Sequence, residues 1–228
     1  MMIKKNFSFK EHFVNSFELL MALQKNNTLK TLRDPLWWPR SCSFWVIVGV
    51  ILTQQTKWEK VEQSIENLEK AGIDSLEKLA LLDEYFLATL IKPSGFYNTK
   101  AKRLKTLCKA IVDEFGSFED FCLKVDRDWL LAQKGIGEES ADSILCYACG
   151  REVMVVDAYT ARLLYAFGYE FDDYASIQSW LVEGISQNYH KLEKIALNKV
   201  YALFHGEIVE FCKKNSRGKM VNAEMLGF

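Results

Sequence analysis

The sequence predicts an all-α protein. Of its 228 residues only 3 are proline and 12 are glycine, and runs of β-branched residues are scarce. Apolar residues recur instead at the three- and four-residue spacing of a helix face. The composition, 49% hydrophobic and 26% charged, is ordinary for a folded soluble protein. The length suits one large domain or two small ones.

Helical spacing recurs along most of the chain. Residues 43–52 are apolar on all sides, which is typical of a helix buried in a core. Residues 61–72 and 75–90 are amphipathic, and Ser75 is a natural helix cap. The other predicted helices are residues 9–26, a helix from the turn 93–101 to Phe115, a short one at 117–121, and helices at 175–190 and 192–214. We expect the last two to pack against the first.

The most informative stretch runs from Trp129 to Arg162. It reads as a helix, a tight turn at 135–137 (Gly-Ile-Gly), a second helix, and an extended segment that leads to Asp157 at the start of a third helix. Glycines allow positive φ and a close approach to a ligand, and free amides at a helix N-terminus bind anions such as a phosphate. By itself, Gly-Ile-Gly is more typical of an ordinary turn between two helices, because short glycine motifs are weak signals.

The segments KGIGEESADSIL (134–145) and VVDAYTARLL (155–164) resemble the helix-hairpin-helix/GPD superfamily of DNA base-excision glycosylases, with a weak continuation at 204–206. The chain looks endonuclease III-like and most similar to the 3-methyladenine DNA glycosylase III type. This resemblance implies a helix-hairpin-helix motif at about 129–147 that holds the DNA backbone. It also implies that Asp157 is the catalytic acid and Arg162 its supporting residue. Asp157 is also a suitable N-cap, and the two roles are compatible.

Several further residues are candidates for the base pocket and the DNA contact. In the resembled family a glutamine fills the gap left by an extruded base, which assigns that role to Gln55, with Gln54 as the second choice; the alternative is a polar helix start. Trp37 and Trp38 are interpreted either as an aromatic wall for the base or as a core anchor. Trp58 offers a large π-face for stacking.

The basic residues give two more candidates for DNA contact. Lys100 opens the best basic cluster of the chain, in a segment that also resembles the family; the alternative is a solvated helix face. Lys134 adds a cation beside the turn formed by Gly135, Ile136 and Gly137, which we expect to bind DNA.

The resemblance also indicates what the chain lacks. Family members that cleave the strand carry a lysine where this chain has Glu139, and a carboxylate cannot form the Schiff base. We assign Glu139 to the pocket, with a first-turn helix charge as the alternative. Many relatives bind an iron–sulfur cluster through four C-terminal cysteines, whereas here that region holds Cys212 alone. We therefore expect no iron–sulfur cluster and no metal, although a monovalent cation at the hairpin is compatible with the family. Cys146 and Cys149 are interpreted as core residues.

We expect two helical subdomains with a cleft between them: residues 39–150 with the hairpin, and residues 1–38 together with 151–228. The expected partner is double-stranded DNA that contains damaged bases. The net charge of −1 and a pI near 6.3 require local phosphate contacts rather than a global positive field. No run of about eighteen apolar residues predicts a membrane span. The N-terminus lacks an export signal, so we expect a cytoplasmic protein. Because the expected fold wraps a DNA duplex, we expect a monomer.

The sequence thus predicts a monofunctional DNA glycosylase that flips out alkylated purines of the 3-methyladenine type and hydrolyses the N-glycosidic bond. Glu207 either adds negative charge near the pocket or lies on a helix surface. Three alternatives stay open. The chain could act on another lesion, such as mispaired adenine or a deaminated or oxidised base. It could be a non-catalytic helix-hairpin-helix DNA-binding module, or a helical protein-interaction domain.

Overall fold

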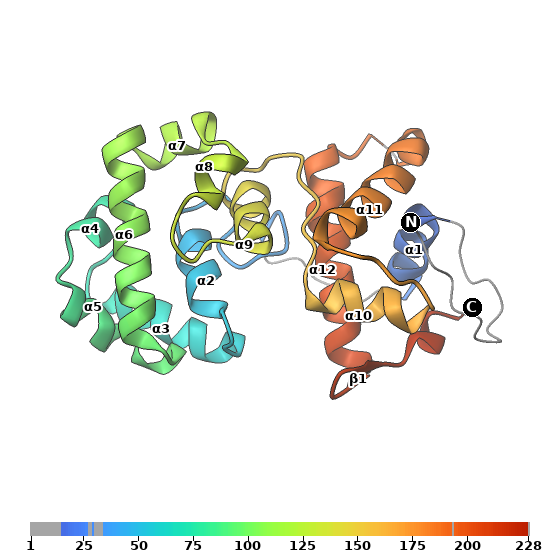
Figure 1. Cartoon of the computed structure of the whole chain (residues 1–228), viewed down its shortest axis with the longest axis horizontal. Coiled ribbons are helices and arrows are strands. Elements are labelled where there is room, and N and C mark those ends of the chain that lie inside the picture. Colours follow the sequence, from blue (N-terminus) through green and yellow to red (C-terminus); the bar gives the residue numbers. More distant parts are fainter. Residues whose placement is uncertain (1–14, 27–28, 30–33, 193, 228) are drawn as a thin grey trace. The chain divides into compact units, whose positions relative to one another are not determined.

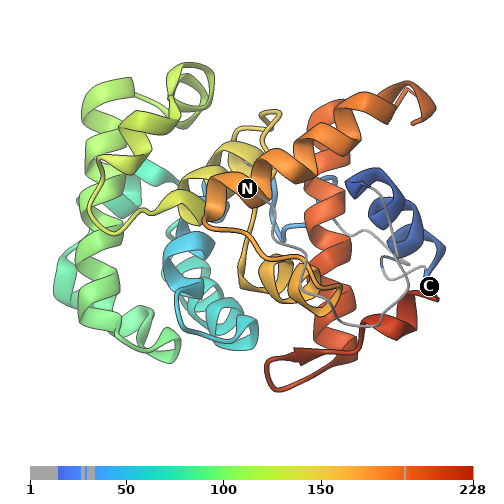
Figure 2. The same ribbon diagram turned by 45° about the vertical axis from the view of Figure 1, so that its right-hand side comes forward.

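The computed structural model of the chain describes residues 15–26, 29, 34–192 and 194–227. Across these residues the fold is mostly helical, which confirms the predicted class. The only sheet in this part of the chain is a hairpin of two strands, β1 (Ser216–Arg217) and β2 (Met220–Val221), which follows the last long helix (Figure 2). None of the described helices is both long and apolar enough to cross a membrane.

The chain divides into two compact units (Figure 1). The central unit is Trp38–Arg151, and the terminal unit combines Met1–Trp37 with Glu152–Phe228. The sequence-based expectation placed these boundaries at residues 39 and 150.

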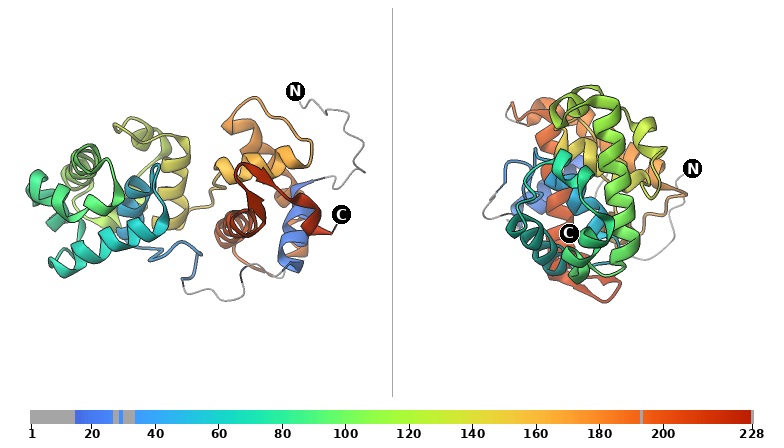
Figure 3. Two further views of the ribbon diagram at one scale, coloured as in Figure 1. Left: turned by 90° about the horizontal axis from the view of Figure 1, so that it is seen from below. Right: turned by 90° about the vertical axis from the view of Figure 1, so that its left-hand side faces the viewer.

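Helix α6 (Tyr97–Phe115) is the longest helix of the central unit, and α4, α5, α7 and α2 all pack against it (Figures 1 and 3). Helix α2 (Trp45–Thr53) is buried from Val46 to Leu52, as its uniformly apolar sequence predicts. The remaining elements of this unit are α3 (Trp58–Lys70), α4 (Leu76–Leu81), α5 (Glu84–Leu90), a 3₁₀ turn (Lys92–Ser94), α7 (Phe118–Lys124), α8 (Arg127–Leu131), α9 (Glu138–Ser143) and a π-helical turn (Ile144–Ala148).

The prediction of one helix over 75–90 is wrong, because two helices meet there. Leu82 is extended, and the Asp83 carboxylate accepts a hydrogen bond from the Phe86 amide at 2.9 Å, which starts α5 as a new helix. The Lys105 ammonium donates to the carbonyl of Leu82 at 2.7 Å and satisfies the acceptor that the break leaves open.

In the terminal unit, α1 (Ser16–Lys25) packs against α11 (Tyr174–Asn188) and α12 (Leu197–Asn215), as expected from the sequence (Figure 3). Leu19, Leu23 and Leu181 are fully buried in the core that these helices share. Residues 9–14 of the first predicted helix lie outside the described residues. The other elements of the unit are α10 (Ala158–Ala166), a 3₁₀ turn (Tyr189–Lys191) and a final 3₁₀ turn (Ala223–Leu226).

Candidate active site and DNA-binding turn

Asp157 is the N-cap of α10, which confirms the capping interpretation. Its Oδ1 accepts hydrogen bonds from the Thr160 amide at 2.8 Å and from the Thr160 hydroxyl at 2.9 Å. The preceding segment is anchored by the buried side chains of Val155 and Val156. Oδ1 is therefore committed to the helix start, and the carboxylate is held at a fixed position in front of α10.

The second carboxylate oxygen faces a histidine. His205 Nε2, from α12, lies 3.5 Å from Asp157 Oδ2, and the side chain of Asp157 is only 12% exposed. Burial raises the pKa of Asp157, but the neighbouring His205 and the two Thr160 donors outweigh it, so the pKa lies below its ordinary value. The site thus keeps a deeply placed carboxylate ionised at neutral pH.

Trp37 packs beside this pair. Its ring meets the ring of His205 edge-on, with 5.5 Å between centroids, and the ammonium of Lys213 lies 5.8 Å from the Trp37 centroid. A Cβ at position 206 would come within 2.5 Å of the Trp37 ring, so only Gly206 allows this packing. Trp37 is therefore anchored on α12, with His205 between it and Asp157. Its predicted stacking on a base stays a prediction.

Arg162 does not support Asp157 directly. Its guanidinium lies 5.6 Å from the centroid of the Tyr159 ring, and the described residues show no hydrogen bond or ion pair between Arg162 and Asp157. The side chain that does face Asp157 is His205, whose only sequence signal was the weak family likeness at 204–206. Glu207 is 7% exposed, so its interpretation as a surface glutamate is wrong.

The Gly-Ile-Gly turn joins α8 to α9. Gly135 has φ +88°, and a Cβ there would meet the side chain of Arg103 at 2.8 Å, so this position requires glycine. Gly137 has φ −102°, which any residue can adopt, so the expectation of positive φ is wrong for it. A Cβ at Gly137 would have no neighbour within 4 Å, so the surface there is open.

The start of α9 presents free donors. Gly137 is its N-cap, and the amides of Gly137, Glu138 and Ser140 have no hydrogen-bond acceptor within the part of the chain that the structure describes. Ile136 is buried and its amide donates to the carbonyl of Gln133 at 3.1 Å, so it shapes the turn, and its predicted contact with DNA stays a prediction. Lys134 is exposed beside the turn. The arrangement suits an anion at the amides.

The two candidate glutamines differ in their surroundings. Gln54 bridges two elements: its Nε2 donates to the carbonyl of Gly135 at 3.0 Å, and its Oε1 accepts from Arg103 Nη1 at 3.1 Å. Gln55 is exposed, has φ +55°, and makes no hydrogen bond to any described residue. A non-glycine residue at positive φ is strained, and such strain is common at functional sites. The structure thus leaves Gln55, and not Gln54, available for a ligand.

Lys100 is buried, although the sequence predicted that it contacts DNA. Only 2% of it is exposed, and its ammonium donates to the carbonyls of Leu52 and Ser94, each at 2.8 Å, and to the Thr56 hydroxyl at 2.7 Å. Burial lowers its pKa to about 8. Lys100 therefore fixes the loop that carries Gln55 and cannot contact DNA, contrary to the prediction.

Trp38 and Trp58 belong to the central unit and meet edge-on, with 5.8 Å between ring centroids. Trp38 also lies against Tyr147, at 5.2 Å. A Cβ at Gly49 would approach Trp38 at 3.2 Å and Trp58 at 3.5 Å, so a small residue there makes room for both rings. Glu139 is exposed in the first turn of α9, and its assignment to the pocket stays a prediction.

The structure shows no group of three or more histidine, cysteine or acidic side chains placed to hold a metal ion in residues 15–26, 29, 34–192 and 194–227. Cys146 is fully buried, in agreement with its interpretation as a core residue. Cys149 is half-buried at the end of the π-helical turn.

Comparison with known proteins places this geometry in a family. Residues 48–174 match the family described as HhH-GPD superfamily base excision DNA repair protein. A Methanocaldococcus jannaschii protein named "Putative DNA repair glycosylase MJ1434" is 38% identical over 213 residues, which cover 90% of this chain and 92% of the relative. The crystal structure of H. pylori 3-methyladenine DNA glycosylase (MagIII) bound to 1,N6-ethenoadenine has a TM-score of 0.86 and 45% identity, and covers 90% of this chain and 100% of that one.

A trapped endonuclease III–DNA covalent intermediate is more distant, with a TM-score of 0.66 and 18% identity over 92% of each chain, and shares the fold. The family match extends over more than half of the chain, and the alignment with the archaeal relative covers nearly the whole of both proteins. The resemblance drawn from the two sequence segments is thereby confirmed, and this chain belongs to the HhH-GPD superfamily of base excision DNA repair proteins.

Proposed function

We propose that this chain is a monofunctional DNA glycosylase that removes alkylated purines of the 3-methyladenine type from double-stranded DNA. Membership of a base excision repair family supports a DNA substrate and a glycosylase activity. The similarity over 90% of the chain to a protein named 3-methyladenine DNA glycosylase supports the class of base. Water is the only co-substrate of the proposed hydrolysis.

The observation that carries the proposal is the ionised, buried carboxylate of Asp157. As the N-glycosidic bond breaks, positive charge develops on the sugar, and a preorganised anion in a site of low polarity stabilises that charge strongly. The same carboxylate is suited to orient the attacking water. A 3-methylated adenine is already cationic in DNA and departs as a neutral base, so the reaction needs no general acid.

The remaining candidates have complementary roles. Gln55 would fill the space left by the extruded nucleotide, since its amide can hydrogen-bond the unpaired partner base. The amides at the start of α9, with Lys134 beside them, would hold a backbone phosphate. Trp37, Trp38 and Trp58 are the candidate stacking faces for the flipped base. Glu139 stands where a Schiff-base lysine would be needed, which supports hydrolysis without strand cleavage.

The test is base release from alkylated duplex DNA by the wild type and by Asp157→Asn, followed by chromatography of the free bases. Asparagine caps a helix about as well as aspartate, so the variant should fold. We expect the wild type to release 3-methyladenine and to leave the strand intact until hot alkali cleaves it. The variant should bind the same DNA and release at least about 10²-fold less base, as is typical when one strong electrostatic contribution is lost.

Each other outcome has a definite meaning. Release of mispaired adenine, or of a deaminated or oxidised base, would keep the role of Asp157 and change the substrate. Strand cleavage without alkali would refute the monofunctional assignment. DNA binding without release of any damaged base would make the chain a binding module.

A further inference from the structure

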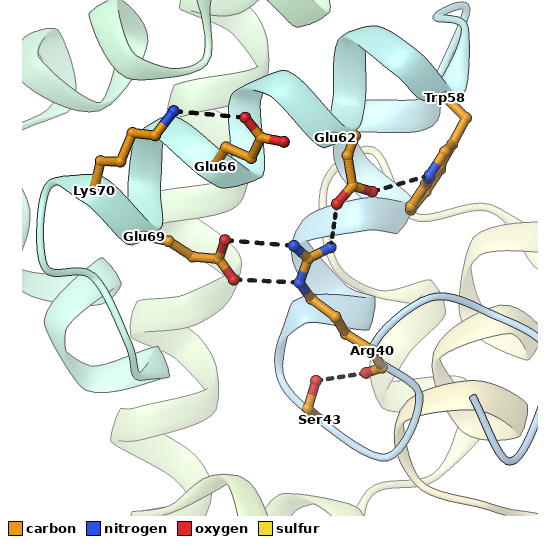
Figure 4. Close-up of polar contacts among 7 residues, drawn as sticks. All are labelled: Arg40, Ser43, Trp58, Glu62, Glu66, Glu69 and Lys70. Atoms are coloured by element: carbon orange, nitrogen blue, oxygen red, sulfur yellow. Dashed lines mark hydrogen bonds and ion pairs between the residues drawn. The ribbon is translucent and has the colours of Figure 1, made fainter. Parts of the chain in front are cut away.

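Trp58 is held by a carboxylate that is itself part of an ion-pair network (Figure 4). The indole N–H of Trp58 donates to Glu62 Oε2 at 3.1 Å, and Glu62 Oε1 accepts from Arg40 Nη1 at 2.7 Å. Arg40 also contacts Glu69, through Nε to Oε1 at 3.3 Å and through Nη2 to Oε2 at 3.4 Å. The single positive charge of Arg40 thus pairs with the two negative charges of Glu62 and Glu69. These three side chains together keep one excess negative charge beside the indole.

The loop that contains Arg40 is held in place by a contact that is independent of the ion pairs. Arg40 has φ +58°, and its carbonyl accepts a hydrogen bond from the Ser43 hydroxyl at 2.6 Å (Figure 4). Its side chain is 26% exposed, and that of Glu62 is 33% exposed. The pair is therefore partly shielded from water, where electrostatic interactions are stronger than between fully exposed groups. The carboxylate of Glu62 is held at the edge of the Trp58 ring.

A hydrogen bond from an indole N–H to a carboxylate does more than fix the ring. It is a charge-assisted bond, and the anion at the N–H edge pushes electron density of the indole toward its faces. The face of an indole attracts cations through its quadrupole. A more electron-rich face favours a cationic ring stacked on it and has little effect on a neutral ring of the same size.

We propose that Glu62 is a positioning residue that sets base specificity, because its carboxylate makes Trp58 favour cationic alkylated purines over neutral lesion bases. This inference rests on the proposed function, in which Trp58 is a stacking face for the base. It names the feature of the substrate, its positive charge, that the stacking face selects.

The chain offers a matched control. Glu62 and Glu69 lie on the same helix, α3, and both contact Arg40, but only Glu62 contacts Trp58. Glu62→Gln keeps an oxygen that can accept from the indole and removes the charge. Glu69→Gln removes an equal charge from the same network and leaves the Trp58 contact untouched. The difference between the two variants isolates the effect that passes through the indole.

The experiment compares two free nucleosides that are both modified at N1 of adenine. The ring of 1-methyladenosine is cationic at pH 7, and that of 1,N6-ethenoadenosine is neutral. Dissociation constants are measured by NMR titration of the full chain, with the Trp58 indole N–H resonance as the reporter. We expect the wild type to prefer the cation. Glu62→Gln should lower the cation-to-neutral affinity ratio about fivefold, the effect of a modest cation–π contribution, and Glu69→Gln should change it less than about twofold.

A double-mutant cycle completes the test. In a Trp58→Phe background no N–H is left, so Glu62→Gln should no longer change the ratio, which is measured there from backbone amide resonances because the indole reporter is absent. An equal loss of both affinities in Glu62→Gln would mean that Glu62 only holds the structure, and would overturn the inference. So would equal effects of the two glutamate variants, or a wild type without any preference for the cation. A preserved charge preference in a chain that releases no base from DNA would refute the proposed function and leave the role of Glu62 standing.

Discussion

At the scale of single residues, the pair Asp157–His205 governs the state of the candidate catalytic group. The carboxylate is buried, which by itself favours its protonated form, and the ionised form prevails because His205 and Thr160 stabilise it. The two hydrogen bonds from Thr160 belong to the helix cap, so they would persist in most variants. His205 lies on a different helix, so it can be changed without disturbing the cap.

We therefore predict that His205→Gln shifts the acid limb of the pH–rate profile to higher pH. In the proposed reaction the active form of Asp157 is the carboxylate, and its pKa in the folded chain lies below the ordinary value, so wild-type activity should persist as the pH falls past the usual carboxyl range. Removing His205 raises that pKa, so activity is lost earlier as the pH falls. The measurement is kcat/KM for base release across the acid range.

Asp173→Asn is the control, because Asp173 forms the same kind of capping box at the start of α11, and its exposed carboxylate owes its lowered pKa to Ser176 and not to His205. Its acid limb should coincide with that of the wild type. An unshifted limb in His205→Gln would mean that the histidine does not stabilise the carboxylate.

At the scale of elements, the contact between α1 and α11 depends on one glycine. A Cβ at Gly184 would lie 2.4 Å from the Ser16 hydroxyl oxygen and 2.7 Å from the Ser16 backbone nitrogen. The Ser16 hydroxyl donates to the carbonyl of Leu181 at 2.6 Å, so this contact also carries a buried hydrogen bond. The two helices approach this closely because position 184 has no side chain.

Gly184→Ala should therefore destabilise the chain, although alanine is the better helix former. Helix propensity alone would stabilise the variant by about 1 kcal/mol. Forcing a methyl group into a packed contact costs about 1–3 kcal/mol, and here one of the obstructing atoms belongs to the backbone. We expect the packing cost to win, with a net loss of about 1–2 kcal/mol in the free energy of urea unfolding.

Ser179→Ala, at an exposed position of the same helix, measures the propensity effect alone. It should be neutral or slightly stabilising. A stabilised Gly184→Ala variant would show that the α1–α11 contact is looser than the structure indicates.

Features that depend on neighbours within a few residues could be predicted from the sequence. These are the apolar run of α2, the Gly-Ile-Gly turn and the Asp157 cap. The break at Leu82 was also local, since Asp83 is a good N-cap, but the continuing apolar stripe of residues 75–90 obscured it.

The features that were missed depend on distant parts of the chain. Lys100 looked like one member of a basic helix face, and only the packing of α6 against the end of α2 turns its ammonium inward. His205 meets Asp157 across 48 positions of sequence, and no spacing rule connects them. Adjacent Trp37 and Trp38 were both expected in the terminal subdomain, yet they belong to different units.

At the scale of the whole molecule, the net charge of −1 is the feature that DNA binding must overcome. A chain with no net positive charge gains little from a global field, so its affinity for phosphates must come from a few local donors. Lys100 is not among them, because it is buried. Lys134 is exposed beside the free amides of α9 and makes no ion pair with any described residue.

We predict that Lys134→Ala changes the salt dependence of DNA binding in a way that an equal change of net charge elsewhere does not. Each phosphate neutralised by a cation contributes about −0.9 to the slope of log affinity against log salt concentration. Losing one such contact should make the slope shallower by about that amount.

Lys70→Ala is the matched control, because Lys70 is exposed on α3 and pairs only with Glu66 among the described residues. Its loss also lowers the net charge by one. Fluorescence anisotropy with duplex DNA at several salt concentrations measures both slopes. Two equally shallower slopes would indicate that the global charge governs binding, whereas two unchanged slopes would mean that Lys134 touches no phosphate and that the α9 amides act without it.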